Sequence, residues 1–309
     1  MRRLAAGLVL LALLGVAAFW VATVPRGLSA AEIAALPAGD AGRGEAVFWI
    51  GGCASCHAAE KAKGEERLKL GGGRVLRTAF GDFVVPNISS DPADGIGAWS
   101  EADFANAMLR GVAPDGRHLY PAFPYASYIR MEPADVADLR AFLATLPAVS
   151  GRTPGHDLRF PFGFRRGIGL WKLAFLTAAP AVEIGGEDAP EDAAVSRGQY
   201  LVEGPGHCGE CHTPRSFGGA MDFARWLGGA PAAEGEGRVP NITGGAGGIG
   251  DWSAGDIVYF FETGFLPDFD SVGGSMVDVQ ENLAMLAGED REAIAAYLKA
   301  VPPQDSARP

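Results

Sequence analysis

The chain has 309 residues, enough for about two domains, and its 48% apolar and 20% charged residues are typical of a globular protein rather than a disordered one. The net charge is −11, and without a basic stripe this acidic balance argues against nucleic acid as a partner. All four cysteines fall within two short motifs, so none is left to form a structural disulfide.

Residues 1–24 are predicted to be a membrane anchor. After two N-terminal arginines, the uncharged run Leu4–Val24 is long enough to span a bilayer, whereas the apolar part of a secretory signal peptide is only about 7–15 residues long. The best cleavage site, at residues 28–30, has leucine where a small residue is required. We therefore favour an uncleaved anchor over a removed signal peptide, with the arginines in the cytoplasm and the rest of the chain exported. Residues 25–39 are expected to form a tether.

Two C-x-x-C-H motifs dominate the rest of the sequence. They are Cys53-Ala54-Ser55-Cys56-His57 and Cys208-Gly209-Glu210-Cys211-His212. This pattern attaches a c-type haem through two thioethers and supplies histidine as one axial ligand of the iron. The sequence thus predicts two covalently bound haem c groups, with His57 and His212 on the iron. The alternative is a zinc site built from both C-x-x-C pairs, but each pair is followed by its own histidine.

The two motifs lie in two copies of one module. Three further elements recur at an offset of 153 or 154 residues. The pairs are 44–48 with 198–202, 85–89 with 239–243, and 95–100 with 248–253. The repeat predicts one domain over 40–147 and a second over 193–302.

Helix signals also agree between the copies. Ser100 with Asp103, and Ser253 with Asp256, have the spacing of a capping box, and Gly111 and Gly264 follow where a left-handed C-terminal residue belongs. Each Trp-Ser pair should therefore start a helix of roughly ten residues. A closing helix is expected in each copy, ended by Pro147 and by Pro302. Because no convincing strand pattern is present, we predict an all-α fold.

These motifs carry a resemblance. Gly-x-x-x-Phe before C-x-x-C-H, followed by a closing helix with Ala-Phe-Leu (141–143) or Ala-Tyr-Leu (296–298), resembles class I cytochrome c. The elements Pro-Asn-Ile-Ser/Thr and Gly-Ile-Gly-x-Trp-Ser and the run 117–125 resemble, more narrowly, the membrane-anchored cytochrome c subunits of periplasmic alcohol and gluconate dehydrogenases and their stand-alone dihaem relatives in bacteria. The resemblance covers about residues 40–302.

The resemblance implies two tandem class I cytochrome c-like domains behind a single N-terminal transmembrane helix. The helix would span the bacterial inner membrane, and the haem domains would lie in the periplasm. The dehydrogenase subunits typically carry three haems, whereas this sequence has two motifs.

Electron-carrying cytochromes usually complete the iron coordination with methionine. In the second copy Met276 lies in the loop before the closing helix, where this ligand is expected. Met285 is nearer to that helix, and we expect it to pack in the core, while Met221 is expected to pack in a loop.

The first copy has no methionine at the matching position, because Phe123 aligns with Met276. Met131, just before the closing helix, is our choice, and the related cytochromes often carry methionine there. Met108 lies inside a predicted helix and is expected to be core. His118 would give a bis-histidine site and is more simply a loop residue near a haem edge; His156 and His207 have weaker claims.

Two repeated elements are candidates to support the haems. Axial imidazoles usually donate their second N–H to a carbonyl, and Pro86 and Pro240 are candidate acceptors. Trp99 and Trp252 either reach haem propionates through their indole N–H or simply pack.

Residues 148–192 form a connector and residues 303–309 a tail. The connector includes an aromatic and basic stretch, 160–173, that is either a surface for a membrane or a partner, or a belt between the two domains, and we favour the belt.

We expect an electron carrier rather than an enzyme. The protein would take electrons from a periplasmic dehydrogenase and deliver them to a soluble cytochrome or a terminal oxidase of the respiratory chain. The alternative is a dihaem redox enzyme, of the peroxidase or thiosulfate-oxidising type, with an open or displaceable sixth position at the first haem.

Overall fold

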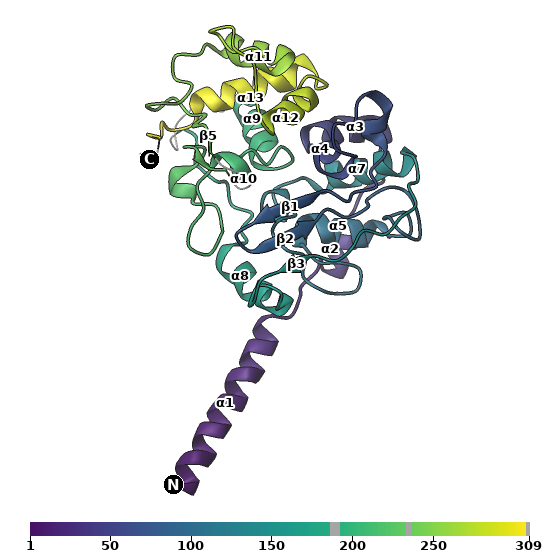
Figure 1. Cartoon of the computed structure of the whole chain (residues 1–309), viewed down its shortest axis with the longest axis vertical. Coiled ribbons are helices and arrows are strands. Elements are labelled where there is room, and N and C mark those ends of the chain that lie inside the picture. Colours follow the sequence, from purple (N-terminus) through teal and green to yellow (C-terminus); the bar gives the residue numbers. More distant parts are fainter. Residues whose placement is uncertain (186–191, 233–236, 307–309) are drawn as a thin grey trace.

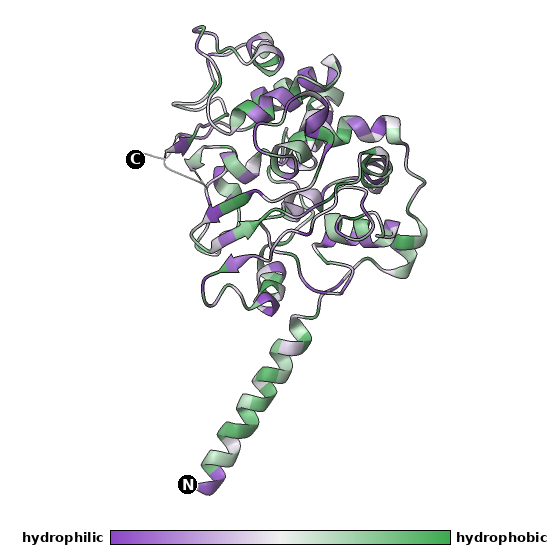
Figure 2. Ribbon diagram, turned by 45° about the vertical axis from the view of Figure 1, so that its right-hand side comes forward, coloured by the Kyte–Doolittle hydropathy of each residue, from purple (hydrophilic) through white to green (hydrophobic). Residues whose placement is uncertain are grey.

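The computed structural model describes residues 1–185, 192–232 and 237–306. Figure 1 shows a body of helices and loops from which one long helix, α1 (Arg2–Ala22), projects. Figure 2 shows that α1 is hydrophobic for most of its length and hydrophilic at its N-terminal end. Part of the predicted connector, 186–191, and the end of the tail, 307–309, lie outside the described residues.

The body is mainly helical. Its α-helices occur in two runs separated by the connector helix α8 (Ile168–Phe175). The first run is α2 (Ala30–Ala34), α3 (Ala41–Ile50), α4 (Cys53–His57), α5 (Glu101–Arg110), α6 (Tyr125–Tyr128) and α7 (Pro133–Thr145). The second run is α9 (Ala193–Glu203), α10 (Gly209–His212), α11 (Ala254–Thr263), α12 (Met276–Leu283) and α13 (Gly288–Ala300). Short 3-10 helices are η1 (Gly64–Leu68), η2 (Arg165–Gly167) and η3 (Phe223–Arg225).

The expectation of an all-α fold needs one correction, because short strands are present. An antiparallel three-stranded sheet has the order β1 (Val75–Thr78), β2 (Gly81–Val84) and β3 (Asp157–Leu158). A second pair joins β4 (Ala230–Pro231) to β5 (Arg238–Val239). Strands of two to four residues are too short to show an alternating pattern in the sequence, which is why they were not predicted.

The predicted capping signals are confirmed. The hydroxyls of Ser100 and Ser253 each accept a hydrogen bond from the backbone N–H three residues on, and the carboxylates of Asp103 and Asp256 accept one from the backbone N–H of the cap serine. The helices that follow, α5 and α11, are both 10 residues long and end at glycines with φ of 59° (Gly111) and 76° (Gly264). Local sequence alone therefore defined both ends of these two helices.

Two helix crossings form the frame of the body. Helix α3 packs on α7 in the first half and α9 packs on α13 in the second. At each crossing a glycine allows the backbones to meet: a Cβ on Gly44 would lie 2.0 Å from the carbonyl oxygen of Asp138, and a Cβ on Gly198 would lie 1.9 Å from that of Ala293. This close approach is the physical reason for the Gly-x-x-x-aromatic or apolar pattern that precedes each haem motif.

Gly198→Ala is expected to lower the free energy of unfolding by about 1–3 kcal/mol, since the new methyl group overlaps a backbone carbonyl and forces α9 and α13 apart. Guanidinium denaturation of the haem-loaded protein measures the change. Gly288→Ala is the matched control, because a Cβ there meets nothing within 4 Å. If the two variants have the same free energy of unfolding, the close packing of α9 on α13 at Gly198 is contradicted.

The segment predicted as a tether is bound to the first domain. The backbone N–H of Leu28 donates to the side chain of Asn106 on α5 (2.6 Å), and Glu32 pairs with Arg110 (2.9 Å). A capping box at Ser29 begins the short helix α2. This segment therefore positions α1 on the domain instead of holding it at a distance.

Candidate haem sites

Each C-x-x-C-H motif folds as a single helical turn, α4 in the first half and α10 in the second. In both, the Nδ1 atom of the histidine lies 2.8 Å from a proline carbonyl oxygen: His57 faces Pro86, and His212 faces Pro240. The predicted acceptors are thus confirmed. The contact assigns the proton to Nδ1 and leaves the Nε2 lone pair available for a metal.

Burial governs the protonation of the motif side chains. Burial lowers the pKa of His57 to about 4 and also lowers that of His212, so both rings are neutral. Burial raises the pKa of the Cys53 and Cys208 thiols to about 12. Within the described residues, no group of three or more His, Cys, Asp or Glu side chains is placed to hold a metal ion. A zinc site shared by the two motifs is therefore not formed there.

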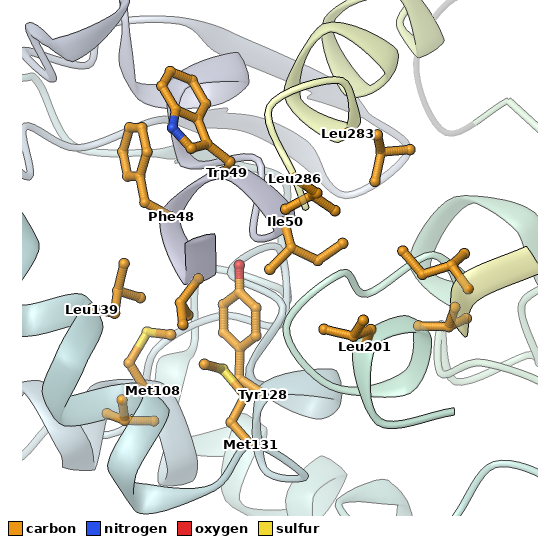
Figure 3. Close-up of a cluster of buried hydrophobic side chains, with 14 of the residues drawn as sticks. Phe48, Trp49, Ile50, Met108, Tyr128, Met131, Leu139, Leu201, Leu283 and Leu286 are labelled. Atoms are coloured by element: carbon orange, nitrogen blue, oxygen red, sulfur yellow. The ribbon is translucent and has the colours of Figure 1, made fainter. Parts of the chain in front are cut away.

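The methionine candidates of the first half lie together. Met108 and Met131 are 5% and 4% exposed and belong to the buried cluster that also contains Ala54 of the first motif and Tyr128. Figure 3 shows Met108, Tyr128 and Met131 side by side near the helix that carries Phe48–Ile50. The structure brings both candidates to this region.

In the second half Met276 begins α12 and is partly buried against the core. Met285 is 53% exposed, so the expectation that it packs in the core is wrong. The turn in which it lies carries its side chain outward, while the next residue, Leu286, is buried. Leu286 precedes the start of α13 by two residues, as Met131 precedes the start of α7. The two halves can therefore be compared at two positions. The first half has Phe123 and Met131, and the second has Met276 and Leu286 in the corresponding places.

The histidines outside the motifs have other roles. Nε2 of His118 lies 2.9 Å from the carbonyl oxygen of Thr23, at the end of α1. His156 accepts a hydrogen bond from the backbone of Val84 (3.1 Å), and His207 lies with Nε2 3.2 Å from the carbonyl oxygen of Gly51. These contacts occupy one nitrogen of each ring. A structural role therefore accounts for all three histidines.

Each motif contacts the opposite half of the chain. Ser55, the residue before Cys56, accepts a hydrogen bond from the Asn282 amide (2.8 Å), and Glu210, the residue before Cys211, accepts one from the Ser127 hydroxyl (3.1 Å). Ser55 and Glu210 hold the same position in their motifs, and Ser127 and Asn282 are separated by the same 155 residues. The interface therefore has approximate two-fold symmetry with a haem motif on each side.

Sequence reasoning missed the residues that fill this interface. Tyr128 is 6% exposed, so burial raises the pKa of its hydroxyl, and its ring packs edge-on against His207 with 5.6 Å between ring centroids. Asn282 is 1% exposed and also contacts Arg67. Because their partners lie in the other half of the chain, no local pattern could identify them.

A buried polar chain runs from the second motif to the first half. The Trp226 ring packs where a Cβ of Gly209 would lie, and its Nε1–H donates to the Tyr297 hydroxyl (2.9 Å). Tyr297 donates to Glu203 (2.7 Å), which pairs with Arg130 at 3.8 Å, the residue before Met131. Glu203 also accepts from Gln199 (2.9 Å) and from the backbone of Ala181 (2.6 Å).

Comparisons with known proteins agree with this geometry. Residues 41–147 match the cytochrome c family. A dihaem c-type cytochrome of Cereibacter sphaeroides is 53% identical over 97% of this chain and 98% of its own length.

Two dehydrogenase subunits are also similar. The cytochrome c subunit of the quinone alcohol dehydrogenase of Gluconobacter oxydans is 33% identical over 92% of this chain, and that of gluconate 2-dehydrogenase of Pantoea cypripedii is 36% identical over 86%. This chain spans 60% of the length of each of these two. The chain belongs to the dihaem c-type cytochromes of the cytochrome c family, which bind haem c covalently, and is related to the cytochrome c subunits of membrane-bound dehydrogenases.

Proposed function

We propose that the protein is an electron carrier that faces the periplasm, takes electrons from a dehydrogenase and delivers them to a soluble cytochrome or a terminal oxidase. The observation that carries this proposal is that each haem motif binds the opposite half of the chain, Ser55 to Asn282 and Glu210 to Ser127. Each haem, when bound, supplies a one-electron iron couple. Because each motif lies at the interface between the two halves, both redox centres would border that interface, and electron transfer requires such proximity whereas two independent sites would not.

We propose His57 with Met131 and His212 with Met276 as the axial pairs, and Cys53, Cys56, Cys208 and Cys211 as the attachment points. Pro86 and Pro240 fix the two imidazoles, because each carbonyl binds the Nδ1 proton and sets the plane of the ring. The side chain of Met131 is buried, and that of Met276 is partly buried against the core. Thioether ligands of this kind raise the potential and keep small molecules away from the iron.

A stopped-flow experiment tests this function. The full-length protein, reduced with ascorbate, is mixed with an oxidised soluble c-type cytochrome, and we expect both haems to be reoxidised. Addition of hydrogen peroxide or thiosulfate to the same protein should give no catalytic turnover. Peroxidase or thiosulfate oxidation activity at one haem would instead support the alternative, a dihaem redox enzyme with a displaceable ligand at the first site.

Alcohol and gluconate dehydrogenases are candidate donor classes, since the similar subunits serve enzymes of those names. This chain aligns with only part of the length of those subunits, but with nearly the whole length of the dihaem relative. We propose that the protein acts as a two-haem carrier that docks to a dehydrogenase through its haem domains.

Helix α1 is proposed to be a retained anchor in the inner membrane. Within the described residues it is the one helix long and apolar enough to cross a membrane, a test that a signal sequence also passes. The end of α1 is built into the body: Thr23 is fully buried, its hydroxyl accepts from Arg166 (2.9 Å), and its carbonyl contacts His118. A cleaved signal peptide would leave these partners without Thr23.

Replacing residues 1–22 with a cleavable secretory signal peptide is expected to move the haem-loaded protein from the membrane fraction to the soluble periplasmic fraction. Haem absorbance of the two fractions measures the change. The wild-type protein should be found in the membrane fraction, and its mass should include residues 1–22. A soluble wild-type protein lacking these residues would overturn the anchor.

A further inference from the structure

The connector exposes apolar side chains beside the end of α1. Phe160 is 96% exposed, Phe164 55%, Leu170 47% and Leu173 63%. We refer to these four residues as the connector platform. Leu170 and Leu173 are three residues apart on α8 and share a face, while Lys172 on the other side binds the carbonyl oxygens of Arg110 and Gly111. The packing of α8 on the body thus leaves its apolar face outward.

The platform is continuous with the proposed membrane span. The ring of Phe164 stacks on that of Phe19 in α1, with 6.0 Å between centroids, and the Arg166 guanidinium lies 4.6 Å from the centre of the Trp20 ring. Gly169, in the first turn of α8, allows close approach to Thr23, because a Cβ there would lie 2.6 Å from the Thr23 Cβ. Figure 1 shows α8 beside the point where α1 meets the body.

The position of Phe19 fixes the depth of the platform. Phe19 lies four residues before Thr23, which is about 6 Å along a helix axis. The run Leu4–Val24 is about 30 Å long, so it only just spans the hydrocarbon core. If α1 spans a bilayer, Phe19 is therefore within the membrane boundary, and Phe164, stacked on it, must lie there too.

The charge of the connector fits the same location. Residues 158–177 contain four basic residues and no acidic one, although the whole chain has a net charge of −11. Arg165 and Arg166 bind within the protein, Arg165 to the carbonyl oxygen of His118 and Arg166 to Trp20. Arg166 thus holds the connector to the end of α1, and no carboxylate in this stretch would repel anionic lipid headgroups.

From these observations we infer that the connector platform lies in the bilayer, at the boundary between headgroups and acyl chains of the leaflet where α1 ends. Apolar and aromatic side chains on a short helix parallel to a membrane bind there by burying apolar area. The inference rests on the proposed anchor. It adds that the haem domains are held to the membrane surface at a second point and cannot swing freely about α1.

Nitroxide labelling of the full-length, haem-loaded protein tests the platform. The protein is placed in nanodiscs of phosphatidylethanolamine with phosphatidylglycerol. Because the four native cysteines are used in thioethers, an introduced cysteine is the only free thiol. Leu173→Cys is the test variant, Leu13→Cys in α1 calibrates the membrane, and Phe269→Cys, at a site 88% exposed in the second half, is the matched aqueous control.

We expect the label at 173 to be relaxed more by oxygen than by an aqueous nickel complex, as at 13, and the label at 269 to show the reverse. Unchanged haem spectra confirm that each variant is folded. Aqueous behaviour at 173 with protection at 13 would overturn the platform and leave the anchor intact. Aqueous behaviour at both 13 and 173 would overturn anchor and platform together, without affecting electron transfer. Protection at 173 only after a dehydrogenase is added would show a protein-binding surface and overturn the lipid assignment.

Discussion

Met131→Ala is expected to make one haem of the reduced protein bind carbon monoxide, with loss of the methionine–iron charge-transfer band at that haem. Met131 is 4% exposed and belongs to the buried cluster that also contains Ala54 of the first motif, and it would hold the first haem as the second axial ligand, with His57 as the first. Truncation to alanine leaves that position open. Absorbance spectroscopy with a carbon monoxide titration gives the number of open sites, which should rise from none to one.

Three other methionines provide the comparisons. Met276→Ala should open the second haem in the same way, and the double variant should open both. Met285→Ala should leave both haems closed to carbon monoxide, because that side chain is 53% exposed. Met108→Ala should lower stability by about 2–5 kcal/mol through loss of buried volume while the charge-transfer band persists. If Met108→Ala removes the band and Met131→Ala does not, the first axial pair is wrong.

Glu203→Gln is expected to lower the free energy of unfolding by about 3–5 kcal/mol. The Glu203 and Arg130 side chains are 3% and 7% exposed, so the substitution leaves a buried guanidinium without its counter-charge. Glutamine keeps the volume of the side chain, which separates the loss of charge from the formation of a cavity. Guanidinium denaturation of the haem-loaded protein, followed through the haem absorbance, measures the change.

The matched control is Glu262→Gln. Glu262 also pairs with an arginine, at 2.7 Å from Arg291, but its side chain is 44% exposed. The pair is screened by water, so the free energy of unfolding should change by at most about 1 kcal/mol. Because Arg130 directly precedes Met131, Glu203→Gln should also weaken the charge-transfer band of the first haem. If Glu203→Gln lowers the free energy of unfolding by no more than Glu262→Gln does, the buried Glu203–Arg130 pair does not contribute to stability.

Features that depend on neighbouring residues could be predicted from the sequence. The capping boxes at Ser100 and Ser253 need only three residues of context, and both were confirmed. The proline acceptors were found because Pro86 and Pro240 recur in the two copies at the spacing of the histidines. In each case repetition turned a weak local pattern into a reliable one.

Features that depend on distant partners could not be predicted. Asn282 donates a hydrogen bond to Ser55, which is 227 residues away in the sequence. Glu203 accepts a hydrogen bond from the hydroxyl of Tyr297, which is 94 residues away. A polar residue in a sequence is expected to be exposed, and only the fold reveals that these two are buried and paired. The exposure of Met285 is a related case, since a shift of one residue in a turn decides whether Met285 or Leu286 points inward.

The reciprocal contacts of the two motifs bear on how such a gene could arise. Ser55 binds Asn282, and Glu210 binds Ser127, so equivalent positions meet in both directions, as they do in a homodimer with a two-fold axis. Duplication of a gene for a one-haem subunit that already formed this dimer would give a tandem chain with its interface complete. Fusion would then free each copy to diverge, since a substitution no longer appears on both sides of the axis. The methionine at 276, where the other copy has Phe123, is a divergence of this kind.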